Sequence, residues 1–382
     1  HTRWNCSSRG LGDVYKRQGL FCAFLLLGCA AGNDYPENII LFIGDGMGVS
    51  HVTAGKISRG NIHLERFSTV GLVTTHSADR LVTESAAAST ALATGYKTNN
   101  RAISVSVDRE PLKTLFEYAK EQAKSIGVVV TASVTHATPA AFMAHADDRD
   151  QQDDIAEQIA NSGIDVLIGG GWAYFVPAAS LGSKRKDQKN LLAELETRMP
   201  LILTDDKLSA SMHTDTRKLA ALMSPGSLPK AADRDYSMAR LTRSAMQILS
   251  KNRNGFVLMV EGSQIDWAAH YHDPQYLVAE LIDFDEAVGA GLDFAEKNRR
   301  TLIVVTADHE TGGLAVHDGS TKNRQAAATA FTTTGHTAAM VPLFAYGPGS
   351  DLFSGIQDNA GVGQSLIELL LKKEMKNQAG AQ

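Results

Sequence analysis

Six short apolar segments constrain the fold of this chain more than any other feature of its sequence. They are rich in Val, Ile and Leu, and polar residues do not alternate with apolar ones along them. Strands of a parallel sheet covered on both faces have this pattern, because neither face of such a strand meets water. We therefore predict buried strands at 38–43, 126–131, 165–168, 256–260, 301–306 and 341–346.

Helical patterns separate these predicted strands. Asp273 followed by Pro274 is typical of a capped helix start, and Pro111 also suits the first turn of a helix. Alternation of strands and helices predicts an α/β fold: a doubly wound, mostly parallel central sheet with helices on both faces. We predict helices at about 111–125, 236–251, 274–298 and 363–373.

Two regions interrupt this alternation. Residues 171–235 form a long stretch with weak periodicity, and residues 312–335 are polar and rich in Ala and Thr. We interpret both as insertions into a single domain that spans 30–382, and we expect a small crown-like lobe among them.

Residues 1–29 resemble a targeting segment. A Lys-Arg pair precedes the apolar run 19–27, which is too short to span a bilayer and is typical of a signal peptide. The run leads into Leu-Leu-Gly-Cys, ending at Cys29, and this tetrapeptide resembles the lipobox of bacterial lipoproteins. We expect an exported protein, either periplasmic or anchored to a membrane by a lipid on Cys29; a plain signal peptide cut nearby is the alternative. Residues 1–18 look like a remnant foreign to a signal peptide.

Cysteine use and charge restrict the chemistry. All three cysteines lie in the first 29 residues, so the rest of the chain has no disulfide and no thiolate metal site. The net charge is -5, and removing residues 1–28 would make it more negative, which argues against nucleic-acid-specific binding. An anionic substrate would then need local positive charge, and metal ions held by His and carboxylates can supply it.

Potential metal ligands follow the predicted strands. Ligands bind at the carboxyl ends of strands in open α/β sheets, so these side chains would meet at one edge. His and carboxylates without Cys suit zinc, and oxygen-rich positions suit magnesium. A lone pair such as Asp266 and His270 is more often a surface hydrogen bond; the metal site is inferred because all of these residues fall at strand ends. The set comprises Asp45, His136, Thr138, Glu261, Asp266, His270, Asp308, His309 and His336.

An alanine-rich segment supplies a candidate nucleophile. The run at 85–94 favours a helix that Gly95 ends, and Thr83 is placed to cap it. Ser85 would lie in the first turn, where free N–H groups and the helix dipole favour an anion. A serine there can attack phosphorus; the alternative is a helix of small residues packed closely against the sheet.

Together these motifs resemble the alkaline phosphatase family over roughly residues 37–372. They occur in the family's order, which makes the resemblance specific. The matching motifs are LFIGDGMG at 41–48, VTESAA at 82–87, HATPAA at 136–141, VEG at 260–262, ID at 265–266, TADH at 306–309 and GHT at 335–337.

The resemblance implies two zinc ions and one magnesium ion, bound by carboxylates, histidines and hydroxyls. It groups the ligands as Asp266, His270 and His336 for one zinc; Asp45, Asp308, His309 and Ser85 for the other; and Asp45, Thr138 and Glu261, with His136 beside them, for magnesium.

The implied activity is the hydrolysis of small phosphate monoesters through a phosphoserine at Ser85. Arg149 matches the family's phosphate-binding arginine, and a homodimer is expected. Four positions depart from some family members: Glu84, His136, Trp267 and Thr311. Trp267 follows a ligand where some members have Lys, so we expect it near the substrate. These departures bear on metal affinity and pH optimum, and the reaction type is unaffected.

Two other functions stay open. A phosphodiesterase or nucleotide pyrophosphatase of the same superfamily is one, although such relatives usually lack an arginine in the role of Arg149. A lipoprotein that binds metal or phosphate without turnover is the other. A sulfatase is disfavoured, because the sequence has no Cys-x-Pro-x-Arg or Ser-x-Pro-x-Arg motif.

Overall fold

A central sheet of ten strands organises the computed structural model, which describes residues 35–204, 216–320 and 322–379. Strand β13 is antiparallel to both of its neighbours, and all other neighbouring strands are parallel. The order across the sheet is β14 (Gly355–Asp358), β2 (Thr69–Thr74), β13 (Val341–Tyr346), β8 (Thr301–Thr306), β1 (Asn38–Gly44), β7 (Phe256–Gly262), β3 (Ser125–Ser133), β4 (Val166–Gly170), β6 (Leu219–Leu222) and β5 (Leu201–Ile202).

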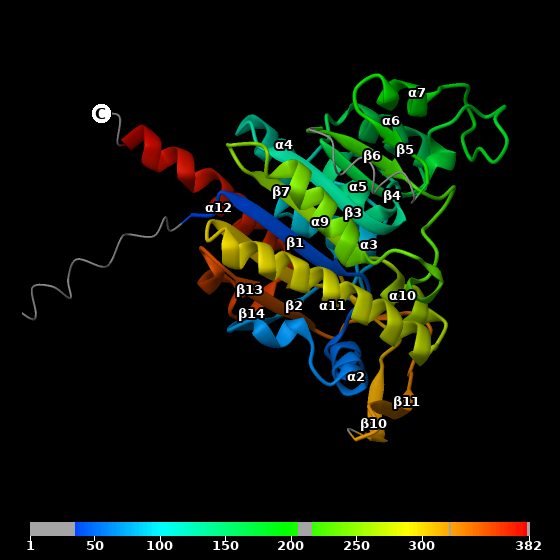
Figure 1. The fold of residues 1–382 in the computed structure, drawn as a ribbon, viewed down its shortest axis with the longest axis vertical. Coiled ribbons are helices and arrows are strands. Elements are labelled where there is room, and N and C mark those ends of the chain that lie inside the picture. The colour runs from blue at the N-terminus through cyan, green and yellow to red at the C-terminus, as the bar shows by residue number, and fades with distance from the viewer. Residues whose placement is uncertain (1–34, 205–215, 321, 380–382) are drawn as a thin grey trace, which may run out of the picture. The chain divides into compact units, whose positions relative to one another are not determined.

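Helices cover both faces of this sheet (Figure 1). One face carries α2 (Val49–Arg59), α9 (Met238–Leu249) and α11 (Pro274–Lys297), and the other carries α3 (Ser85–Thr94), α4 (Leu115–Glu121), α5 (Ala137–Met143) and α12 (Asn359–Ala379). Further helices are α6 (Gln152–Asn161), α7 (Leu191–Glu196), α10 (Gln264–His270) and the short 3-10 helices at His63–Arg66, Trp172–Tyr174, Ala231–Asp233 and Ser350–Phe353.

The predicted α/β fold class and the six predicted strands are confirmed. Every residue of β1, β7 and β8 is buried, as expected for strands covered on both faces. The helix expected from Pro111 is wrong at its start: α4 begins at Leu115, because Thr114 caps it by accepting a hydrogen bond from the Glu117 backbone at 3.2 Å. Strands β2 and β14 were not predicted; in β2 buried and partly exposed residues alternate.

The two interrupting regions differ in structure. Within 171–235, strands β5 and β6 extend the central sheet. Within 312–335, β10 (Ala315–Ser320) and β11 (Gln325–Ala330) form a hairpin outside it (Figure 1). Two further short strands, β9 (Glu310–Thr311) and β12 (His336–Thr337), pair with each other. No helix among the described residues is long and apolar enough to cross a membrane. The predicted targeting segment, with Cys29, lies outside the described residues.

Candidate active site and metal centre

Three adjacent parallel strands bring the predicted carboxylate ligands to one edge of the sheet. In β1, Ile43 is in register with Glu261 of β7 on one side and with Thr306 of β8 on the other. Ile43, Glu261 and Thr306 thus lie side by side across the three strands. Asp45 follows Ile43 by two residues and Asp308 follows Thr306 by two, so both lie just past Glu261. All three carboxyl groups are fully buried. The sheet register alone thus accounts for their convergence.

His309 lies at the centre of the first ligand group. Its Nε2 is 3.4 Å from Asp45 Oδ1, 3.2 Å from Asp308 Oδ2 and 3.3 Å from Ser85 Oγ. The backbone N–H groups of Gly46 and His309 donate to Asp308 Oδ1, at 3.1 and 2.9 Å. Those bonds fix the carboxyl group and leave its Oδ2 free to face the site.

The second group comes from α10 and β12. Asp266 and His270 are one helical turn apart, with His270 Nε2 at 3.2 Å from Asp266 Oδ2. His336 Nε2 lies 3.3 Å from His270 Nε2 and 3.6 Å from Asp266 Oδ1. The pairing of β12 with β9 sets His336 opposite Thr311.

Backbone carbonyls determine which nitrogens of these histidines face the site. The Thr334 carbonyl is 2.5 Å from Nδ1 of His270, and the Thr83 carbonyl is 2.9 Å from Nδ1 of His336. Both Nδ1 atoms therefore carry a proton and donate a hydrogen bond, so each Nε2 presents a lone pair when its ring is neutral. Two lone pairs 3.3 Å apart repel each other, and a shared cation removes that repulsion. This arrangement fits a metal ion.

The third group surrounds Glu261. One ligand atom each from Asp45, His136 and Glu261 lie within 4.8 Å of one another. Within the described part of the chain, several buried atoms here accept or donate no hydrogen bond. They are both carboxyl oxygens of Asp45 and of Glu261, Oδ2 of Asp308, Oγ1 of Thr138 and Nδ1 of His136. Buried polar atoms normally have partners, so this concentration of unpartnered ones also fits bound cations.

The electrostatics of the centre agree with this interpretation. Burial, with the nearby Asp308 charge, raises the pKa of Glu261 to about 8, and burial raises the pKa of Asp308 to about 6. Burial, together with the nearby carboxylates of Asp308, Asp266 and Glu261, raises the pKa of Asp45 well above its usual value. Burial opposes ionisation of Asp266, but His270, His309 and His336 outweigh it and hold its pKa below the ordinary value. Such a set of buried acids needs compensating positive charge.

The candidate nucleophile begins a helix, as predicted. Ser85 is the first residue of α3 and is buried, and Gly95 ends the helix with a φ of +77°. The capping residue is Glu84 and not Thr83, because the Glu84 carboxylate accepts from the backbone N–H groups of Ala86 (3.1 Å) and Ala87 (2.9 Å). Carboxylate capping holds this first turn, and with it Ser85, at the edge of the metal centre.

Glu84 also binds Arg149. Arg149 Nη1 donates to Glu84 Oε2 at 2.5 Å, and Nη2 lies 3.1 Å from His136 Nε2. Glu84 stands where alkaline phosphatases often have Asp, and its longer side chain still reaches Arg149. These contacts place the Arg149 guanidinium beside Glu84, the residue before Ser85, and beside His136 of the Glu261 group.

Two further positions complete the surroundings. The ring of Trp267 meets that of His136 edge-on, with centroids 6.2 Å apart. Thr311 Oγ1 donates to Asp266 Oδ1 at 2.5 Å and lies 3.2 Å from His309 Nδ1, so it links two ligands. His51 was not among the predicted site residues; its Nδ1 accepts a hydrogen bond from the Gly48 backbone N–H at 3.1 Å and so holds the loop that carries Asp45.

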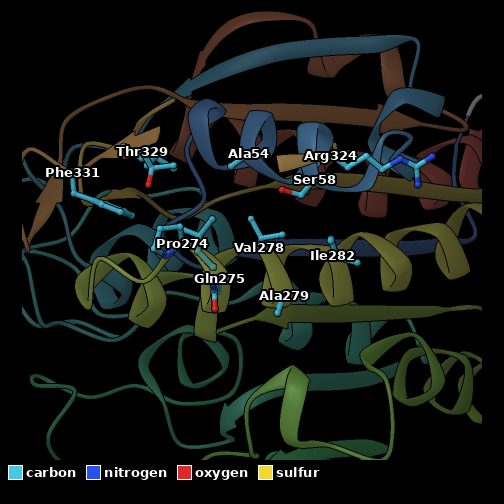
Figure 2. A pocket seen from close by; sticks show the side chains of 12 residues that line it. Ala54, Ser58, Pro274, Gln275, Val278, Ala279, Ile282, Arg324, Thr329 and Phe331 are labelled. Atoms are coloured by element: carbon cyan, nitrogen blue, oxygen red, sulfur yellow. The ribbon is translucent and has the colours of Figure 1, made fainter. Parts of the chain in front are cut away.

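A groove away from these residues is shown in Figure 2. It runs between α2, α11 and the β10–β11 hairpin, with a volume of about 570 Å³, and it is lined mainly by apolar side chains such as Val278, Ile282 and Phe331. None of the predicted site residues lines it. The candidate site is therefore identified by its ligand geometry.

Comparison with known proteins gives consistent matches. A model described as alkaline phosphatase matches residues 36–322. The chain is 34% identical to alkaline phosphatase 4 of Bacillus subtilis, over 87% of this chain and 88% of that protein. The solved alkaline phosphatase of the Antarctic bacterium TAB5 is 36% identical and superimposes with a TM-score of 0.81, covering 88% of this chain and 98% of the other. A variant of that enzyme, 37% identical with a TM-score of 0.80 and the same two coverages, was solved with magnesium bound.

Proposed function

The chain belongs to the alkaline phosphatase family, and we propose that it hydrolyses small phosphate monoesters through a phosphoserine formed on Ser85. The observation that carries this proposal is the position of Ser85. It begins α3, its Oγ lies 3.3 Å from His309 Nε2, and its neighbour Glu84 holds Arg149. A nucleophile, a cation-binding centre and a group that recognises anions thus adjoin one another.

The proposed cofactors are two zinc ions and one magnesium ion. Asp266, His270 and His336 would hold the first zinc, and Asp45, Asp308 and His309 would hold the second, next to Ser85. The oxygen-rich set of Asp45, Thr138 and Glu261, with His136 beside it, suits magnesium. When bound, two such ions stabilise the attacking and leaving oxygens of an in-line displacement and lower the pKa of the attacking hydroxyl.

Ser85 performs the first displacement in this proposal. Its Oγ forms a bond to phosphorus, the bond from phosphorus to the ester oxygen breaks, and the leaving alkoxide takes up a proton. Water then attacks the phosphoserine, which releases inorganic phosphate and restores the serine hydroxyl. The N-terminal turn of α3 favours the negative charge that both steps place beside it.

Arg149 would bind two phosphoryl oxygens through its guanidinium. Its contacts with Glu84 and His136 hold one edge of the planar group, and a bidentate bond to phosphate needs a fixed plane. A diester offers fewer charged oxygens, so this arginine favours monoesters.

Turnover of paired aryl substrates tests the proposed function. The metal-loaded protein should hydrolyse an aryl phosphate monoester much faster than the matching diester, chelation should abolish that activity, and zinc plus magnesium should restore it. A preference for the diester would favour a phosphodiesterase. Binding of phosphate without turnover would favour the non-catalytic alternative, and full activity in rigorously metal-free protein would end the metal proposal.

We also propose export, a lipid anchor at Cys29 and a homodimer, none of which follows from the site. Incorporation of labelled fatty acid into the full chain, lost in Cys29→Ser, is the expected result for the anchor. Retention of the label in that variant would refute it. Sedimentation of the purified protein gives its subunit number.

A further inference from the structure

Arg101, in the loop that follows α3, touches both supports of Arg149. Its backbone N–H donates to Glu84 Oε1 at 2.7 Å, on the carboxylate whose other oxygen accepts from Arg149. Its carbonyl accepts from the backbone N–H of Arg149 at 2.8 Å. One residue therefore fixes the carboxylate partner of Arg149 and the main chain that carries Arg149.

The Arg101 side chain binds the residues on either side of Arg149. Its Nε and Nη2 donate to the two oxygens of Asp148, both at 2.8 Å, and Nη2 also bonds to Asp150. A two-point bond between a guanidinium and a carboxylate sets orientation as well as distance. The Arg101 side chain thus orients segment 148–150 through bonds to Asp148 and Asp150, the two neighbours of Arg149.

The backbone at Arg101 argues that the side chain is functional. Its φ is +77°, in the left-handed region that glycine adopts without strain and that is sterically unfavourable for a residue with a Cβ. The side chain is 47% exposed, and solvent at such a surface limits what its ion pairs add to folding to about 1 kcal/mol. A glycine would suit the backbone better and cost the fold little, so the contacts of the guanidinium are what the arginine adds.

We propose that Arg101 is a positioning residue for phosphate recognition, holding Glu84 and segment 148–150 so that Arg149 meets two phosphoryl oxygens at once. This inference rests on the proposed function, since it assumes that Arg149 binds the phosphoryl group. Arg101 itself touches no reacting atom in this account; it acts through Arg149.

Arg101→Gly tests the proposal without straining the backbone. We expect kcat/KM for an aryl monoester to fall about tenfold, mainly through KM, and the dissociation constant of inorganic phosphate measured by calorimetry to rise by a similar factor. The melting temperature should not fall. Arg101→Lys should recover part of the loss, because its ammonium keeps the charge but lacks the fork that bonds both Asp148 oxygens.

Arg109→Gly is the matched control. Arg109 also has a positive φ, +69°, is exposed, and bonds the same segment one residue earlier, at the Asp147 carbonyl (3.0 Å). No contact with Glu84 or Asp148 is found for it among the described residues. Its loss should leave kcat/KM and phosphate binding within about twofold of the wild type.

A double-mutant cycle identifies the route of the effect. If Arg101 acts through Arg149, then Arg101→Gly should cause little further loss in an Arg149→Ala background. Additive losses, an equal loss in Arg109→Gly, or an unchanged phosphate affinity in Arg101→Gly would each overturn the inference. Absence of monoester turnover by the metal-loaded wild type would instead refute the proposed function, and phosphate calorimetry would still test Arg101.

Discussion

At the scale of single residues, the site is defined by atoms that lack ordinary partners. Ser85 Oγ faces His309 Nε2, while the carboxyl oxygens of Asp45 and Glu261 have no hydrogen bond within the described structure. The hydroxyl of Ser89, one turn further along α3, is buried and also without a described partner, but Ser89 takes part in none of the contacts described above among the candidate ligands. The two serines therefore form a matched pair for mutation.

We predict that Ser85→Ala lowers kcat by about a thousandfold or more, because the displacement loses its nucleophile. Ser89→Ala should keep nearly full activity and stability, since it removes a hydroxyl without a described partner. Labelled phosphate trapped by acid quench should be found on Ser85 by peptide mapping. Label on Thr90 instead would show that the nucleophile is misassigned.

Trp267 is predicted to weaken the binding of product phosphate compared with lysine at that position. Its ring lies 6.2 Å from that of His136, which contacts Arg149. A positive charge about 6 Å from phosphate is worth on the order of 1 kcal/mol, or roughly a fivefold to tenfold change in affinity. Trp267→Lys should therefore lower the inhibition constant for phosphate and, where product release limits turnover, lower kcat at alkaline pH. An unchanged inhibition constant in folded, metallated protein would contradict this role.

At the scale of elements, the placement of α3 depends on its close packing against α12. A Cβ on Gly363 would meet the carbonyl oxygens of Ala91 and Leu92 at 2.3 and 2.8 Å. The two helices thus approach backbone to backbone, and the glycine of α12 permits it. Since α3 begins at Ser85 and is capped by Glu84, this packing helps to set where Ser85 lies relative to the metal centre.

Gly363→Ala should lower the free energy of unfolding by about 1–3 kcal/mol, because backbone atoms cannot yield as a side chain does. The displaced α3 should also reduce kcat. Gly361→Ala is the control on the same helix, since a Cβ there meets nothing within 4 Å. That change should be neutral or stabilise by up to ~1 kcal/mol. Denaturant unfolding of both variants measures the difference, and equal stabilities would rule out the close approach.

At the scale of the whole molecule, the cation centre couples metal content to stability. Burial raises the pKa of Glu261 to about 8, and the Asp266 carboxylate raises the pKa of His270 to about 9. In metal-free protein between pH 6.5 and 8, the folded state therefore keeps protons that the unfolded state releases. The free energy of unfolding should fall as pH rises through this window, because the folded state binds more protons than the unfolded state and is therefore disfavoured when protons become scarce.

We predict that the melting temperature of metal-free protein falls by a few degrees from pH 6.5 to pH 8. With zinc and magnesium bound, the melting temperature should be higher and should not fall over this range, because ligands deprotonate more easily as pH rises. Calorimetry of both forms in matched buffers measures this. A metal-free protein that becomes more stable over the window would contradict the described environment of Glu261.

Much of the fold was predictable because buried strands are marked by their composition. The segments of β1, β7 and β8 are apolar throughout, and no face of them meets water. The direction of β13 was not predictable, since an apolar strand has the same composition whichever way it runs. Strand β2 was missed because it is partly exposed, and β14 because it is short and lies at the sheet edge.

The sequence by itself determined which side chains form the centre, because ligand chemistry belongs to residue types and their place at strand ends is local. Only the tertiary structure decided how those side chains act. Nε2 of His270 and Nε2 of His336 face the site because the Nδ1–H groups of the two rings donate to the carbonyls of Thr334 and Thr83. Thr83 lies 253 positions from His336 in the chain. Backbone carbonyls are common to every residue, so no sequence pattern marks such contacts, and only folding brings them together.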